Sequence, residues 1–530
     1  MPPRTKETSF VKQAAILAAA SLFVRIIGFA YRIPFQNMIL ETGIAYYVAA
    51  YSIYTTAIAL SSGALPAVVS RLVSARVALG QYRNAHNMFK TAMAFAVVGG
   101  LVAALVVGIG AGSFANYMGV PGAAMPVRTL APTLVFVAVL AVYRGYFQGM
   151  KNAMPTAISQ VVEQVFKVIC TLWLAHIFFD AANIAPSVAG GTIGTGIGAV
   201  AGLLVVVAVY RVATPGIRRR VYQDRHSPKE TSAQQLETIL QTALPMIVSM
   251  LIFSSINIID QRMAFSRMLA SGYFTLEEAQ ALFGQYTGQF LLLITLPISL
   301  SVALSAAVLP EITHSSTRMD LPSVKQKADM ALRISMMLSI PAAVGLAVLA
   351  DPILTLLFPN LPDAGWLMRV GSISIVFMAM VHVLTGTLQG IGHVRLPIVA
   401  AFFGVVVKVG LNHVLIARPE INILGAVYST IACYVIAAGL NMYFLYRHTG
   451  IIPEFIAAFA KPIVSAVGMG MVCYIVVELV GEVTGNAVAT LAALVAGAVT
   501  YVAFMCLIKG FRKSDVAAMP LPGKVKRWMV

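Results

Sequence analysis

Fourteen apolar segments, each long enough to cross a lipid bilayer, divide the chain and exclude most other ways in which it could fold. The hydrocarbon core offers no hydrogen-bond partner to a peptide group, so such long segments cross as helices. Hydrophobic residues make up 59% of the 530 residues and charged residues 11%, a balance that excludes a soluble domain. The sequence therefore predicts an all-α polytopic membrane protein with fourteen transmembrane helices, at about residues 10–33, 45–69, 91–112, 128–147, 156–178, 190–212, 237–263, 284–309, 329–349, 367–389, 397–416, 424–446, 462–480 and 487–508.

The positions of the basic residues predict the orientation. An even number of spans places both termini on one side of the membrane. If that side is the cytoplasm, 28 of the 37 lysines and arginines lie in inner loops and tails, 5 lie near the outer face and 4 lie inside spans. Short cytoplasmic loops carry such an excess of basic residues. We therefore expect a multi-pass protein with both termini cytoplasmic, and we assign the net charge of +17 to these loops rather than to nucleic-acid binding.

Two pairs of similar stretches predict an internal repeat. Gly145-Tyr-Phe-Gln-Gly149 and Gly386-Thr-Leu-Gln-Gly390 lie 241 residues apart, as do Lys167 and Lys408 that follow them. The Leu-Pro pair at residues 65–66 occurs again 244 residues later in the chain. Two six-helix lobes in the same orientation account for both offsets. The predicted organisation is an N-terminal lobe at 1–213, a basic cytoplasmic linker at 214–235, a C-terminal lobe at 236–447, and two additional transmembrane helices with a basic cytoplasmic tail at 448–530.

The first apolar segment carries two arginines, Arg25 and Arg32. Seven residues make about two helical turns, so the two guanidinium groups share one face with Ser21 and Gly28 and lie roughly 10 Å apart. A charged side chain at the bilayer centre costs about 3 kcal/mol on insertion scales. Both arginines are therefore expected to face a polar interior. Snorkelling of Arg32 to the outer interface is the alternative for that residue.

Other polar residues lie inside the predicted spans and should line a cleft between the two lobes. Glu163 precedes Lys167 by four residues, the favourable order for an ion pair within one helix. Tyr46 and Tyr47 are expected in the aromatic belt at the membrane interface. The candidate substrate-binding residues are Arg25, Arg32, Tyr51, Gln148, Glu163, Lys167, Asn257, Asp260, Arg262, Lys408 and Asn412.

The charge of this interior favours an anionic substrate. Four basic residues lie inside spans, against Glu163 and Asp260 as acids, whereas an exporter of organic cations needs buried carboxylates. Arginine is the preferred partner of phosphate and pyrophosphate. We find no phosphate-binding P-loop, no G-x-S-x-G and no cluster with metal-ligand spacing. We therefore expect a transporter rather than an enzyme, without catalytic residues, metal or cofactor, driven by membrane potential or an ion gradient.

Several stretches resemble a known family. The run from Arg25 to Pro34, the stretch Tyr143-Arg-Gly-Tyr-Phe-Gln-Gly149, Met154-Pro-Thr156 and Gln160-Val-Val-Glu163-Gln are similar to the lipid II flippases (MurJ-like) and the stage V sporulation protein B relatives. These belong to the multidrug/oligosaccharidyl-lipid/polysaccharide exporter superfamily. Fourteen spans also favour this branch over the drug exporters, which have twelve.

The resemblance implies a flippase that moves a polyprenyl-pyrophosphate-linked oligosaccharide, above all lipid II, to the outer leaflet by alternating access in the bacterial cell membrane. It implies a cationic cavity with Arg25 and Arg32, an acid at Asp260, and a groove for the polyprenyl tail on the last two spans. The chain departs from the family in having no arginine in its second span before Arg71, and Gly288 with Gln289 in the eighth.

Three alternatives remain open at this stage. They are export of another lipid-linked glycan, such as a teichoic-acid or capsule precursor; a multidrug or cation antiporter on the same fold; and a membrane scaffold for cell-wall assembly. The expected partners are the lipid-linked oligosaccharide, membrane lipids and cell-wall synthesis proteins, and the expected oligomeric state is a monomer.

Overall fold

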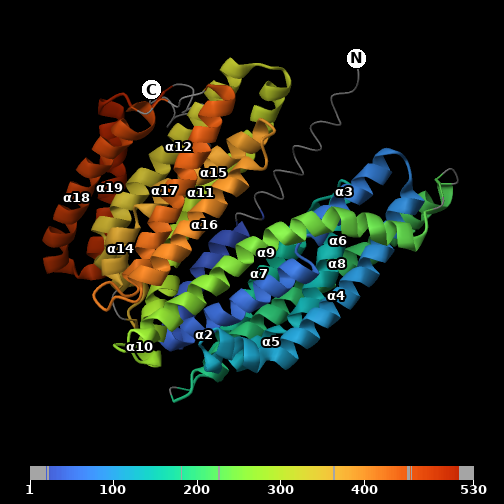
Figure 1. The fold of residues 1–530 in the computed structure, drawn as a ribbon, viewed down its shortest axis with the longest axis horizontal. Coiled ribbons are helices and arrows are strands. Elements are labelled where there is room, and N and C mark those ends of the chain that lie inside the picture. The colour runs from blue at the N-terminus through green and yellow to red at the C-terminus, as the bar shows by residue number, and fades with distance from the viewer. Residues whose placement is uncertain are drawn as a thin grey trace. The chain divides into compact units, whose positions relative to one another are not determined.

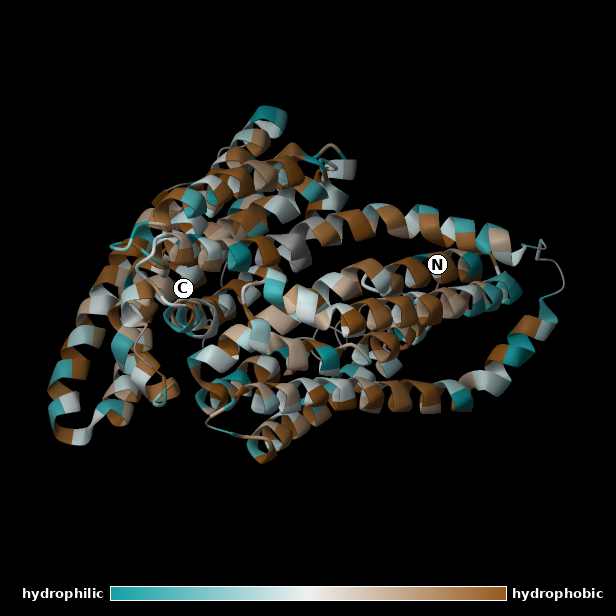
Figure 2. Ribbon diagram, turned by 60° about the horizontal axis from the view of Figure 1, so that its bottom comes forward, coloured by the Kyte–Doolittle hydropathy of each residue, from teal (hydrophilic) through white to brown (hydrophobic). Residues whose placement is uncertain are grey.

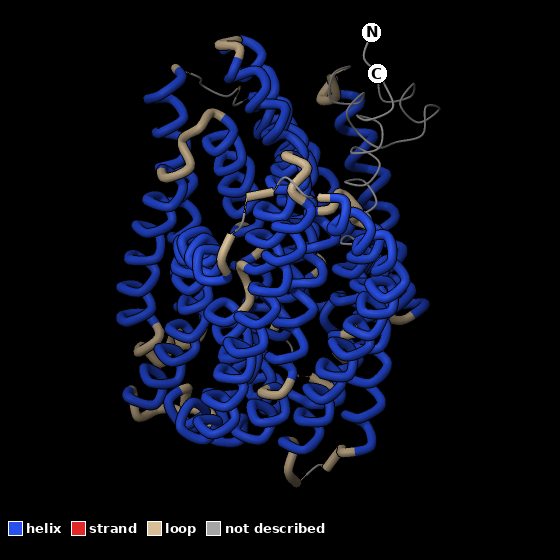
Figure 3. The backbone as a smooth tube through the Cα atoms, turned by 90° about the vertical axis from the view of Figure 1, so that its right-hand side faces the viewer, coloured by secondary structure: helices blue, strands red, loops and turns tan. Residues whose placement is uncertain are grey.

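The described part of the chain is helical throughout. The computed structural model describes residues 20, 23–180, 182–224, 227, 228, 230–361, 364–450, 454 and 456–512, without the side chains of residues 249, 252–257, 303, 306–311 and 317. Figure 3 shows helices joined by short loops, and no strand occurs among these residues. Apolar residues dominate the helices, and hydrophilic residues gather towards many of their ends (Figure 2). The predicted fold class is confirmed in this respect.

The count of spans agrees with the prediction as far as the described residues reach. Ten helices are long and apolar enough to cross a membrane, or twelve if each of two bent pairs is one span. These twelve coincide with every predicted segment except the first and the seventh. Most of the first segment lies outside the described residues, and so do several side chains of the seventh. The total of fourteen stays a prediction.

The helices form two compact units, Met1–Phe265 and Ser266–Val530, which run from blue to green and from green to red in Figure 1. The first unit contains α2 (Arg32–Ser61), α3 (Leu65–Ala78), α4 (Tyr82–Tyr117), the 3-10 turn η1 (Pro121–Ala123), α5 (Ala124–Leu130), α6 (Thr133–Gly149), α7 (Met154–Ile177), α8 (Ala185–Gln223) and most of α9 (Ser232–Ala270).

The second unit begins with the end of α9 and contains the remaining helices. Within it, α18 and α19 pack on each other and the Tyr501 hydroxyl donates to the Met337 carbonyl (2.9 Å), which attaches this pair to α12. The elements are α10 (Leu276–Gly284), the π-helical turn η2 (Gln285–Phe290), α11 (Leu291–Thr317), α12 (Leu321–Val348), α13 (Ala350–Leu357), α14 (Gly365–Gly371), α15 (Ser374–Gly390), α16 (Leu396–Leu415), α17 (Leu424–Thr449), η3 (Ile456–Ala460), α18 (Lys461–Thr484) and α19 (Asn486–Leu507).

Glycines at four-residue spacing bring α7 and α8 into close contact. A Cβ atom at Gly190 would lie 2.6 Å from the Leu174 carbonyl oxygen, one at Gly194 2.4 Å from the Thr171 nitrogen, and one at Gly198 2.6 Å from the Glu163 carbonyl oxygen. The Thr171 hydroxyl donates to the Gly191 carbonyl (3.0 Å) across the same interface. Small residues on one helical stripe let membrane helices approach to backbone contact. This interface fixes the rotation of α7, and with it the direction of Glu163 and Lys167.

The two similar G-x-x-Q-G stretches make similar contacts in their own units. A Cβ atom at Gly145 of α6 would lie 2.8 Å from the Pro66 carbonyl oxygen of α3. A Cβ atom at Gly386 of α15 would lie 2.1 Å from the Ser305 Oγ of α11. In both units the first glycine of the motif therefore sits against the last part of the second predicted span of its lobe, 45–69 or 284–309.

Replacing Gly194 by leucine tests the α7–α8 interface. The new side chain would collide with the backbone of α7, and overpacking of a tight core costs about 1–3 kcal/mol or more. We expect a clearly lower midpoint of thermal unfolding in detergent. The control is Gly216→Leu on the same helix, where no atom lies within 4 Å of the added Cβ. An equal loss of stability in both variants would contradict the close packing of α7 on α8.

Candidate functional site

A break in α2 folds two tyrosines of the chain against each other. Leu40 lies inside α2 with φ 59° and ψ −175°, which no helix contains. The hydroxyl oxygens of Tyr31 and Tyr47 are nevertheless 3.2 Å apart. In a continuous helix their sixteen-residue separation would be about 24 Å. The chain must therefore turn back at Leu40, so that residues 31–39 lie alongside the helix that follows.

This turn assembles an aromatic cluster inside the first unit. The Phe35 and Tyr47 ring centroids are 5.1 Å apart, those of Tyr47 and Tyr51 4.4 Å, and those of Tyr51 and Tyr54 5.7 Å. The Tyr51 hydroxyl hydrogen-bonds to the Thr195 hydroxyl of α8 at 2.7 Å. Tyr47 is 5% exposed, so its predicted place in an interfacial belt is wrong. The fold-back at Leu40 is the reason, because it covers this face of α2.

Two cations lie against these phenol groups. The Lys167 Nζ of α7 lies 5.7 Å from the centroid of the Tyr31 ring and 5.0 Å from that of Tyr51. Arg32 interacts electrostatically with the hydroxyls of Tyr31, Tyr47 and Tyr51. Among the described residues neither cation forms a salt bridge. Neutral hydroxyl groups and aromatic ring faces thus surround the two cations, and the full positive charge of each remains available to an anion.

Glu163 forms an ion pair with Arg144 and not with the partner that the sequence predicts. Its Oε2 lies 2.7 Å from the Arg144 NH2 of α6, and the Arg144 Nε donates to the Ser159 hydroxyl at 2.9 Å. The predicted pair of Glu163 with Lys167 is therefore wrong. The packing of α7 turns the carboxylate towards α6, and Lys167 towards the tyrosines. Arg144 is not among the candidate residues of the sequence analysis, although its position inside Tyr143-Arg-Gly-Tyr-Phe-Gln-Gly149 is a signal for a structural role.

Part of the predicted helix face that carries Ser21, Arg25, Gly28 and Arg32 lies at this cluster. Gly28 faces α7, because a Cβ atom there would lie 3.2 Å from the Gln164 Nε2. Arg32 is half-buried in the cluster, whereas the Arg25 side chain, two turns earlier, is exposed within the described structure. Ser21 lies outside the described residues. Gln148, near the end of α6, is half-buried with no side-chain hydrogen bond in the described part of the chain.

The remaining candidates lie on α9 and α16. On α9, Asp260 is half-buried, and the exposed Arg262 lies over the Tyr117 ring with its Cζ 5.5 Å from the ring centroid. The side chain of Asn257 lies outside the described residues. In the second unit, Lys408 and Asn412 lie one turn apart on α16, and both are buried. The Asn412 Oδ1 accepts a hydrogen bond of 2.5 Å from the Ser429 hydroxyl of α17.

Two curated relatives cover nearly the full chain or most of it. The chain is 28% identical over 524 residues to the uncharacterized membrane protein YabM of Bacillus subtilis (strain 168), covering 97% of this chain and 96% of the relative. It is 26% identical over 453 residues to the lipid II flippase MurJ of the same organism, with 82% of each chain covered.

Two solved structures share the fold of this chain. The lipid II flippase MurJ in an inward closed conformation matches with a TM-score of 0.68 at 16% identity, over 93% of this chain and 98% of that one. An inward-facing multidrug resistance MATE family transporter of the MOP superfamily matches with a TM-score of 0.65 at 17% identity, over 81% and 94%. The resemblance stated from the sequence is confirmed.

The family itself is shown by its sequence profile. The profile described as lipid II flippase MurJ matches residues 88–497, which include the last two thirds of the first unit and most of the second. The chain therefore belongs to the MurJ family, and it is a multi-pass membrane transporter and not an enzyme.

Proposed function

We propose that this protein is a flippase for a polyprenyl-pyrophosphate-linked oligosaccharide, with lipid II, the peptidoglycan precursor, as its substrate. The observation that carries the proposal is the half-buried pair of cations, Arg32 and Lys167, which lie against phenol groups and form no salt bridge with a carboxylate among the described residues. A pyrophosphate supplies the negative charge that this cluster lacks. The names of the relatives, lipid II flippase among them, support the same substrate class.

The sign of the charge separates this function from the export of organic cations. A cation exporter needs a carboxylate free to bind its substrate, and Glu163 is already engaged by Arg144 at 2.7 Å. Bringing an organic cation to Arg32 and Lys167 would add a third positive charge in a medium of low dielectric constant, where like charges repel strongly. The cluster therefore favours an anion over a cation.

The direction of transport follows from the membrane potential. Moving one elementary charge across 100 mV is worth about 2.3 kcal/mol. An anionic headgroup moves downhill from a negative cytoplasm to the outer leaflet, so no nucleotide hydrolysis is needed. We propose alternating access, fourteen spans, cytoplasmic termini and two parallel six-helix lobes as the architecture. The glycine contacts that the two G-x-x-Q-G stretches make support the repeat. Arg25, Gln148, Asn257, Asp260, Arg262, Lys408 and Asn412 remain candidates for further substrate contacts.

The substrate is tested in cells in which this protein is the only candidate flippase, by labelling lipid II with a probe confined to the outer leaflet. Arg32→Gln or Lys167→Gln should reduce the labelling to the level of cells depleted of the protein, because each removes one charge of the cluster. Arg71→Gln, an exposed residue of α3, serves as the matched control and should leave the labelling unchanged.

Protein levels in the membrane must be equal in all variants. Unchanged labelling after full depletion would overturn lipid II as the substrate and direct the search to teichoic-acid or capsule precursors. If Arg71→Gln were present in the membrane at the wild-type level and still abolished the labelling, the assignment of Arg32 and Lys167 to the substrate would be overturned.

The ion pair of Arg144 with Glu163 predicts a non-additive effect on stability. Glu163→Gln leaves a largely buried guanidinium without its partner, and breaking a buried pair costs about 3–5 kcal/mol, less here because both side chains keep some exposure. We expect the double variant Arg144→Gln/Glu163→Gln to be more stable than Glu163→Gln alone, as measured by thermal unfolding in detergent. If the loss of stability in the double variant equalled the sum of the losses in the two single variants, the pair would not be coupled.

A further inference from the structure

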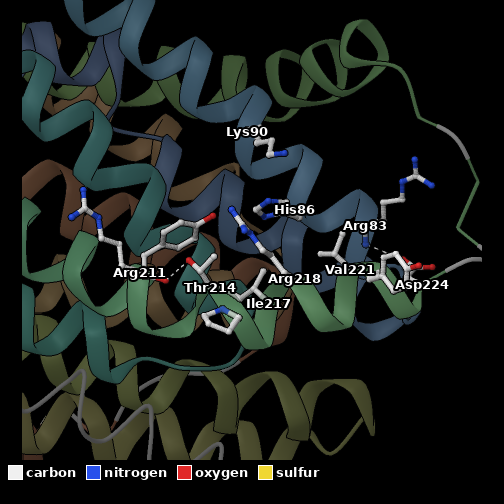
Figure 4. A pocket seen from close by; sticks show the side chains of 12 residues that line it. Arg83, His86, Lys90, Arg211, Thr214, Ile217, Arg218, Val221 and Asp224 are labelled. Atoms are coloured by element: carbon white, nitrogen blue, oxygen red, sulfur yellow. Dashed lines mark hydrogen bonds between the residues drawn. The ribbon is translucent and has the colours of Figure 1, made fainter.

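A basic groove runs along the first unit between α4 and α8, outside the cluster of Arg32 and Lys167. It has a volume of about 1010 Å³. Figure 4 shows its side chains, which come from the start of α4 on one side and from the end of α8 on the other. Four of its lining residues are lysine or arginine: Arg83, Lys90, Arg211 and Arg218.

Three nitrogen-bearing groups gather in the middle of the groove. The Arg218 guanidinium lies beside the His86 ring in Figure 4, and both Arg218 and Lys90 interact electrostatically with that ring. The His86 Nδ1 is buried and has no hydrogen-bond partner in the described part of the chain. Within the described residues, Lys90, Arg211 and Arg218 form no salt bridge. These like charges repel one another until an anion lies between them.

The groove's one acid, Asp224, is already engaged. Its Oδ2 accepts a hydrogen bond from the Arg83 backbone N–H (2.9 Å) and from the Ser227 hydroxyl (2.5 Å). This contact joins the start of α4 to the end of α8. The Asn84 Nδ2 donates to the Pro228 carbonyl (2.9 Å) just beyond it. The walls of the groove are thus held in place, and Asp224 does not neutralise the cations in the middle.

The position of the groove relative to the apolar spans points to a membrane lipid. Lys90 is the last charged residue before the long apolar stretch of α4, and Arg211 is the first one after the apolar stretch of α8. Because the two helices run in opposite directions, both residues mark the end of the hydrocarbon region, at the predicted cytoplasmic side. Arg218 lies two turns further, roughly 10 Å beyond Arg211. The cations therefore begin at headgroup depth.

We propose that this groove binds the phosphate-bearing headgroup of an anionic glycerophospholipid from the surrounding leaflet. Lys90 and Arg211 would bind the phosphate at the edge of the hydrocarbon region. Arg218 and His86 would contact the outer part of the headgroup. Tyr210 and the partly buried Val221 add aromatic and apolar surface beside the cations. Basic pockets between membrane helices on the cytoplasmic side bind anionic lipid headgroups. A free phosphate offers the same charge but gains nothing from this position.

The test is equilibrium binding to the purified full-length protein in an uncharged detergent. The probes are phosphatidylglycerol, phosphatidylcholine and inorganic pyrophosphate. We expect phosphatidylglycerol to bind and phosphatidylcholine not to. Each basic residue near a membrane surface is worth about fivefold in affinity, so Lys90→Gln/Arg218→Gln should weaken phosphatidylglycerol binding about 30-fold.

The matched control removes the same charge outside the groove. Arg71→Gln/Arg219→Gln changes two exposed arginines, the second directly beside Arg218 in sequence but not lining the groove, and should keep the affinity within about twofold. An equal loss in both double variants would overturn the site in favour of diffuse surface charge. Pyrophosphate binding that Lys90→Gln/Arg218→Gln weakens as much as phosphatidylglycerol binding would overturn the lipid in favour of a soluble anion. Pyrophosphate bound at Arg32 and Lys167 would not respond to this variant. Because the assay needs no transport, its outcome is independent of the flippase substrate.

Discussion

The fold of the first unit depends on keeping two cations inside an apolar helical bundle, where no carboxylate among the described residues pairs with either of them. Burying a cation is tolerated only where polar or π-electron partners replace water. Here the partners are phenol groups, with Lys167 Nζ 5.0 Å from the Tyr51 ring centroid and Arg32 in electrostatic interaction with three tyrosines. A neutral phenol stabilises a cation without cancelling its charge. The cluster can therefore remain folded while empty and still attract an anion, which a salt bridge would prevent.

Two local features of the backbone make this arrangement possible. The left-handed conformation of Leu40 turns the chain back on itself, so that Tyr31 at one end of the turn reaches Tyr47 after it. Strained backbone of this kind persists only where the surroundings fix it. The glycines of α8 allow α7 to approach closely, and this approach directs Lys167 towards the tyrosines and Glu163 towards Arg144. A larger residue at Gly194 or Gly198 would change which charges meet.

The first unit therefore uses its basic residues in three different ways. Arg144 is neutralised by Glu163 and contributes to packing. Arg32 and Lys167 are half-buried among neutral partners, and we propose that they bind the substrate. Arg83, Lys90, Arg211 and Arg218 line a groove that begins where the apolar spans end. The distance from the hydrocarbon edge and the presence or absence of a carboxylate distinguish the three groups, although all are the same kinds of side chain.

The sequence by itself determined the class of the fold, because runs of about twenty apolar residues can only cross a membrane as helices. It also determined the family and the excess of positive charge inside the spans, since both can be read from residue types and spacing. The partners of those charges required the tertiary structure. Glu163 and Lys167 have the spacing of an intrahelical pair, yet the rotation of α7 against α8 gives the carboxylate to Arg144. Tyr47 reads as an interfacial residue, yet the turn at Leu40 buries it. Helix rotation and a single left-handed residue are set by contacts between segments far apart in the chain, and the periodicity of one segment carries no information about them.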